Sequence, residues 1–229
     1  MNLSNDGAKY GAGQYRFAHN YDLKDKRFTI AADGKKYGLT FNGKQDLTFD
    51  AGDKPLTIGY ECLKIDKQVY FVRFGMRVAA IDTENGLATL VLPEGYVFGV
   101  IEGSQAAPDK RHAFSDEMVG TAVRWVFGVG RFTDRIYFEE ARCRASFSPK
   151  EENFAFYRTK AVKIKEGMFL VDVEGQVPDL VCVPPGSDRI LVLEDYEHML
   201  FAGCITGKAG TIMVSGYGDF HDFDEALFK

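Results

Sequence analysis

The residues best suited to chemistry are one carboxylate, two phenols and three arginines, all of them in strand-like segments. They are Glu174, Tyr60, Tyr157, Arg73, Arg142 and Arg144. A glutamate can act as a general acid or base when burial raises its pKa, and an arginine can hold a carboxylate through two parallel hydrogen bonds. In combination these residue types would suit a small organic acid.

Each of the charged candidates also has a purely structural interpretation. Glu174 precedes a glycine, which is typical of an exposed strand end. Alternation places Arg142 and Arg144 on the strand face opposite small apolar residues, which favours a solvent-facing position for both arginines. Arg73 lies in a strand that is apolar on both faces, so its charge needs a partner. Glu61 on the adjoining strand would be the structural partner, and an anionic ligand the functional one.

The aromatic candidates divide between filling a core and lining a cavity. Trp125 and Phe127 share one face of their strand, while Phe154 and Phe156 belong to a segment with aromatic or arginine residues on both faces. Tyr157 takes a place close to that of Tyr60 in an internal repeat, and either phenol could meet a ligand or end at a barrel rim. These residues predict a largely apolar binding site.

Composition excludes several classes of function. The 229 residues carry a formal net charge of −5, which disfavours nucleic acid and anionic membranes as partners. The four histidines and four cysteines are scattered, so we expect no metal site, no cofactor and buried free thiols. The N-terminal stretch has no apolar run of secretory type, and the expected location is the cytoplasm.

The elements that must position these residues are short alternating strands. Turn signals such as Asp33-Gly34, Asn42-Gly43 and Asn85-Gly86 supply the positive φ that tight hairpins require. The chain from about residue 27 to 216 is therefore predicted to be an antiparallel, all-β meander. Only residues 115–118 and 222–228 have features of a short helix or helical turn.

The two halves of the chain resemble each other. Lys64-Ile65 and the apolar residues after it match Lys163-Ile164 and theirs at a constant offset of 99, and Phe98–Gly103 is similar to Phe201–Gly207. The predicted domains are an N-terminal extension, a first barrel, a linker, a second barrel and a tail, at residues 1–26, 27–103, 104–117, 118–216 and 217–229.

Closure into up-and-down barrels would hide the edges of about seven strands in each half. We expect two tandem antiparallel barrels, with one larger fused barrel as the alternative. A barrel of about eight strands is filled by side chains or holds one small ligand.

Several motifs resemble the MoaF family, named for molybdenum cofactor biosynthesis protein F. They are Met118–Phe127, Asp134–Glu139 and Phe169–Glu174 in the second half, with Gly34–Phe41 and Val78–Asp82 in the first. The resemblance implies lipocalin-like (calycin) barrels, each with a small-molecule cavity, and a role accessory to molybdenum cofactor metabolism. It does not imply a particular reaction.

A more distant resemblance is to the phenolic acid decarboxylases, which are also lipocalin-like. Gly120 matches a glycine of that family, but Trp125 and Phe127 replace its two tyrosines. Glu174 falls where that family has its catalytic glutamate, and Arg142 or Arg144 lies near its arginine. The missing phenols argue against decarboxylation by that mechanism.

Three hypotheses follow. The first is a cytoplasmic protein that binds a small hydrophobic or aromatic metabolite. The second is a lyase or isomerase that acts on a small unsaturated or aromatic acid, with Glu174 as acid or base, Tyr157 as donor and an arginine on the carboxylate. In the third, both barrels are filled and the protein acts through its surface, as a homodimer.

Overall fold

The computed structural model describes residues 15–52, 54–147, 155–177 and 183–220. Within these residues the fold is all-β, with two closed eight-stranded antiparallel barrels and no helix, so none that could span a membrane. The two-barrel prediction is confirmed. The chain divides into two compact units between Ala113 and Phe114, and the described residues before Ala18 belong to the second unit.

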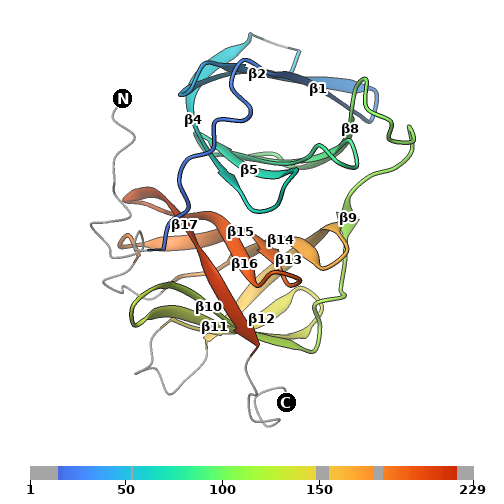
Figure 1. Cartoon of the computed structure of the whole chain (residues 1–229). Helices are drawn as coiled ribbons and strands as arrows, with labels where there is room; N and C mark the ends of the chain where they lie inside the picture. Colours follow the sequence, from blue (N-terminus) through green and yellow to red (C-terminus); the bar gives the residue numbers. More distant parts are fainter. Residues whose placement is uncertain (1–14, 53, 148–154, 178–182, 221–229) are drawn as a thin grey trace. The chain divides into compact units, whose positions relative to one another are not determined.

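The first barrel is a simple meander in which each strand pairs with the next and the last pairs with the first (Figure 1). Its strands are β1 (Arg27–Ala32), β2 (Lys35–Asn42), β3 (Asp46–Asp50), β4 (Leu56–Lys64), β5 (Val69–Phe74), β6 (Arg77–Asp82), β7 (Leu87–Leu92) and β8 (Gly95–Ile101). Alternate residues point inward and fill the barrel with apolar side chains.

The second barrel repeats this topology and adds one short strand. It consists of β10 (Thr121–Gly128), β11 (Arg131–Glu139), β12 (Arg142–Ser146), β13 (Ala155–Lys165), β14 (Met168–Glu174), β15 (Ser187–Asp195), β16 (Leu200–Gly207) and β17 (Gly210–Phe220). The ring closes because β10 pairs with β17 and β12 pairs with β13, while β9 (Ala113–Phe114) adds to β13. The last strand extends four residues beyond the predicted barrel end at 216.

The segments outside the barrels are packed against them. Leu23 is buried in the core of the first barrel. The backbone N–H of Phe17 donates to Ser215 Oγ in the second unit at 2.7 Å. The predicted extension, residues 1–26, therefore contributes described residues to both units. In the predicted linker, His112 is buried and lies 2.8 Å from Thr89 Oγ1 through Nδ1.

The internal repeat is visible in the strand order. The β4–β5 and β13–β14 hairpins are the fourth and fifth strands of their barrels, and Lys64↔Tyr70 pairs as Lys163↔Phe169 does. The predicted equivalence of these hairpins is confirmed. The second match is wrong, because Phe98 lies on the eighth strand of its barrel and Phe201 on the seventh strand of the other.

The turn after the sixth strand shows the repeat at the level of single hydrogen bonds. Asp82 at the end of β6 accepts from the backbone N–H groups two and three residues later, as Asp195 does at the end of β15. In each turn the fifth residue has positive φ, 67° at Gly86 and 52° at Met199. This match aligns Ile81 with Glu194, directly before the two aspartates.

Candidate functional site

The predicted aromatic residues separate into inner and outer positions of the second barrel. Trp125 and Phe127 belong to its buried core, with Trp125 fully buried. Burial of the single tryptophan is therefore confirmed. Phe156 lies on the outer face with 56% of its surface exposed. Phe154 lies outside the described residues, so a wall made by all four rings is not shown.

The polar candidates of the second barrel are not gathered inside it. Arg142 pairs with Glu139 at 2.9 Å, and the Arg144 guanidinium lies 4.8 Å from the centre of the Phe156 ring. Glu174 lies on the outer face, 3.8 Å from the Lys160 ammonium. Tyr157, in contrast, is an inner residue whose hydroxyl donates to the Gln176 carbonyl at 3.3 Å.

Two of the outer candidates share a hollow of about 380 Å³ with mostly charged walls. It is lined by Arg142 and Glu174, with Arg158, Lys160 and Asp172 among its other residues. Asp172 is held by Arg189 through two hydrogen bonds of 2.6 and 2.8 Å. The hollow thus contains ion pairs between protein residues, and the phenol of Tyr157 is not among the groups that line it.

The two candidates in the first barrel have partners within the protein. Tyr60 is fully buried, its hydroxyl donates to the Gly43 carbonyl at 3.2 Å, and burial raises its pKa to about 12. Arg73 donates twice to one carboxylate oxygen of Glu61, at 2.7 and 3.2 Å. The partner of Arg73 is therefore the carboxylate on the adjoining strand, as its structural interpretation proposed.

A different set of ionisable residues meets inside the second barrel. We call Arg135, Tyr137, Glu194 and Tyr196 the buried charge cluster. Arg135 Nη1 donates to Glu194 Oε1, and the same carboxylate accepts from the hydroxyls of Tyr137 at 3.1 Å and Tyr196 at 2.8 Å. Both charged side chains are almost completely buried. The arrangement joins two strands on different sides of the ring.

Burial dominates the electrostatics of this cluster. Burial raises the pKa of Glu194, although Arg135, the two phenols and the indole of Trp125 favour its charged form. The pKa values of Tyr137 and Tyr196 also rise strongly, first through burial and then through the charge of Glu194. A carboxyl with a raised pKa inside a barrel has the electrostatics of many functional groups.

The sequence contains one signal for this cluster, a charged residue at the end of an apolar run. Glu194 ends an apolar run, Ile190–Leu193, just as Arg73 interrupts an apolar strand. A charge in such a strand needs a partner. What the sequence does not contain is the identity of that partner, because Arg135 and Glu194 lie 59 residues apart.

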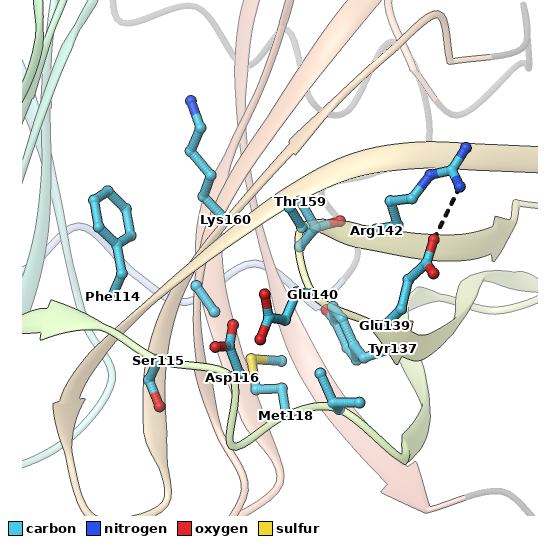
Figure 2. Close-up of a pocket in the computed structure, with 13 residues that line it drawn as sticks. Phe114, Ser115, Asp116, Met118, Tyr137, Glu139, Glu140, Arg142, Thr159 and Lys160 are labelled. Carbon is cyan, nitrogen blue, oxygen red and sulfur yellow. Dashed lines mark hydrogen bonds and ion pairs between the residues drawn. The ribbon is translucent and has the colours of Figure 1, made fainter.

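A cavity of about 180 Å³ lies at the mouth of the second barrel, and we call it the mouth cavity. Figure 2 shows ten labelled residues of its lining. Tyr137 is one of them, so the buried charge cluster and the cavity share a side chain. The apolar part of the lining includes Phe114, Met118, Val119, Ala141 and Ala161.

The cavity exists because β12 is short and β13 is long. The backbone N–H of Thr159 donates to the Ala141 carbonyl, at the turn where β12 begins, and β13 continues beyond this point. Two residues later the Ala161 carbonyl accepts from the Ser115 N–H instead. The space between these two partners of β13 opens into the barrel mouth.

Residues 115–118, predicted as a helix start, form a turn over this opening. Val119 N–H donates to the Asp116 carbonyl at 2.9 Å, and Met118 is buried in the barrel core. Because the chain must enter β10 immediately afterwards, one turn is all that forms here. Met118 thereby becomes part of the cavity wall.

One buried hydroxyl in the lining has no oxygen or nitrogen partner. Thr159 is 94% buried, comes from the inner face of β13 and lines the mouth cavity. Its Oγ1 has no such partner within the described part of the chain, and its interaction with the thiol of Cys143 opposes the rise in the pKa of that thiol. A buried hydroxyl without a partner is unfavourable by about 1–3 kcal/mol. A ligand with a hydrogen-bonding group could satisfy it.

Both barrels contain buried thiols with raised pKa values. Cys62 and Cys143 are free and buried, as predicted, Cys204 is buried, and Cys182 lies outside the described residues. Burial raises the pKa of Cys143 to about 11 and that of Cys62 to about 12. These thiols are therefore protonated near neutral pH and poor nucleophiles.

Comparison with known proteins adds no relative from which a function could be transferred. No protein-family model matches the sequence, and no curated protein matches it. The resemblance to the MoaF family thus stays a prediction from the quoted motifs.

Proposed function

We propose that the second barrel binds a compact small molecule in its mouth cavity. The observation that carries this proposal is a cavity with largely apolar walls, lined by Thr159, whose buried hydroxyl has no oxygen or nitrogen partner among the described residues. Apolar walls with a few fixed polar groups are typical of small-molecule sites. The hydroxyl would orient the ligand, and the walls would supply most of the affinity.

The volume limits the ligand. A cavity of about 150 Å³ is known to hold benzene, and drug-sized pockets begin at about 300 Å³. At about 180 Å³ the mouth cavity suits a single ring with a short substituent. This agrees in kind with the small aromatic metabolite predicted from the sequence. A role in molybdenum cofactor metabolism stays a prediction of the resemblance alone.

The buried charge cluster would form the floor of this site. Tyr137 lines the cavity and donates to Glu194, and Trp125 lies 5.6 Å, between ring centres, from Tyr196, the other phenol on that carboxylate. A ligand that shifts Tyr137 would change the surroundings of Trp125. The indole is therefore a built-in reporter of binding.

For the lyase or isomerase alternative, Glu194 is better suited than Glu174 to act as the acid or base. Glu174 is on the outer face, whereas Glu194 has a raised pKa and two phenol donors. Glu194 is not among the residues that line either hollow. A substrate would need to reach it past Tyr137, so binding without chemistry is the function that the geometry favours.

The test is a screen of single-ring compounds by ligand-observed NMR and by Trp125 emission. The variant Ala161→Leu fills the mouth cavity, and Ala155→Leu, at the other end of β13, is the matched control. We expect binding to the native protein and the control, and loss of binding in Ala161→Leu with an unchanged circular dichroism spectrum. Equal binding by both variants would contradict the proposal.

A further inference from the structure

The charges around the mouth cavity are not balanced. Its lining contains three acidic residues and two basic ones. Glu139 is paired with Arg142 at 2.9 Å, and Lys160 lies 3.8 Å from Glu174 outside this cavity. The other two charged residues of the lining are Asp116 and Glu140. Neither carboxylate has an ion pair or side-chain hydrogen bond in the described part of the chain.

These two carboxylates come from different parts of the fold and face the same space. Asp116 belongs to the turn before β10, and Glu140 to the turn between β11 and β12. Figure 2 shows both carboxylates directed toward the middle of the cavity lining. Two like charges at one opening repel each other, and a positively charged group between them would remove that repulsion.

The cavity below the carboxylates is suited to an organic body and not to a bare ion. Met118, Val119 and Ala161 are apolar, and the Phe114 ring at the rim is 53% exposed. A calcium ion would need six to eight oxygen ligands. The described residues contain no group of three or more side chains that could hold a metal ion. An aromatic ring with an ammonium group fits both parts of the site, because the ring suits the apolar walls and the ammonium suits the two carboxylates.

We infer that the mouth cavity selects a compact primary amine with an apolar or aromatic body, the ammonium lying between Asp116 and Glu140 and within reach of the Thr159 hydroxyl. The inference rests on the proposed binding function and specifies its ligand class. It departs from the small acid that the sequence suggested. The arginines intended for that acid, Arg142 and Arg144, are engaged with Glu139 and with the Phe138 and Phe156 rings.

The experiment compares three ligands of one size with the full-length protein. Benzylamine, benzyl alcohol and benzoate are titrated at low and high salt by protein-observed NMR. We expect benzylamine to bind at least about fivefold more tightly than benzyl alcohol at low salt, with the advantage reduced at high salt, and benzoate to bind most weakly.

Variants then test which residues cause the preference for benzylamine over benzyl alcohol. Asp116→Asn and Glu140→Gln should each weaken benzylamine binding by about fivefold and leave benzyl alcohol unaffected. Glu139→Gln removes an equal charge from the neighbouring residue at the end of β11, but from a paired carboxylate, and should have a smaller effect. Thr159→Val should weaken both ligands by about threefold.

The outcomes separate this inference from the function on which it rests. If benzyl alcohol and benzylamine bind equally, the amine preference is wrong and the binding function stands. If calcium binds and displaces benzylamine, the carboxylates form an inorganic cation site and the inference is overturned. If none of the three ligands binds, the binding function itself fails.

Discussion

The two barrels have the same topology, but only the second has a buried ion pair among the described residues of its apolar interior. Where the first barrel has Ile81, the second has Glu194, and the two positions are aligned by matching aspartate turns. Counted from the positive-φ glycines of the first hairpins, Gly34 and Gly130, the residues Leu39 and Arg135 also correspond. One copy of the fold is filled with apolar side chains, while the other has a buried ion pair below an open cavity.

The difference indicates that the charges are not needed for the fold. A buried ion pair is often no more stabilising than apolar residues of similar volume. The first barrel closes with apolar residues at both places, so the topology does not require the pair. The role proposed for the cluster, as the floor of the binding site, is consistent with this difference, and the first barrel provides the apolar comparison.

The largest expected effect comes from replacing Glu194 in the second barrel by isoleucine, the residue at the matching position of the first barrel. Glu194→Ile leaves the buried guanidinium of Arg135 without its carboxylate, and should lower the free energy of unfolding by about 3–5 kcal/mol. The double variant with Arg135→Leu should recover most of this loss. Denaturant unfolding of both measures it, and equal losses in the single and double variants would show that the pair does not act as a unit.

A smaller effect is expected in the shared turn after the sixth strand. Gly86→Ala places a side chain at φ 67° and too close to Ser104 Oγ, so it should destabilise the protein by about 1–3 kcal/mol. Met199→Gly relieves the same backbone strain but removes packing from the core, and the net change should stay within about 1 kcal/mol. Thermal unfolding compares the two, and a larger loss in Met199→Gly would contradict this view of the turn.

The pH dependence of stability should have opposite signs at two residues, and Glu194 is the first. Its raised pKa means that the folded state holds a proton which the unfolded state releases above the ordinary value of 4.5. Its contribution to the free energy of unfolding should therefore fall as the pH rises above 4.5. Subtracting the curve of Glu194→Gln isolates this gradient, and a rising difference would reverse our assignment.

Asp82 in the first barrel should behave in the opposite way. Burial alone would raise its pKa, but the His112 imidazole, 3.9 Å away, and the hydrogen bonds from Asn85 outweigh burial and lower it below 3.8. Its stabilising contribution is present above pH 3.8 and is lost as the pH falls through the folded-state pKa. Asp82→Asn should therefore flatten the acid limb of the stability curve. An unchanged acid limb would argue against these hydrogen bonds.

Local patterns in the sequence were sufficient for the fold but not for the site. Glycine turns and alternation predicted the hairpins, and the outward direction of Arg142 followed from its strand neighbours. The meeting of Arg135 with Glu194 depends on ring closure, which local patterns do not specify. The mouth cavity likewise depends on the unequal lengths of β12 and β13 and on the turn at Asp116.

The central claim, that binding belongs to the second barrel alone, is tested most directly by mapping backbone amide shifts during a titration with benzyl alcohol. The account predicts that the shifted amides cluster around Met118, Tyr137 and Thr159, with the strands β1 to β8 unaffected. Shifts concentrated in β1 to β8 would contradict it, because they would place the ligand in the barrel whose interior is already filled.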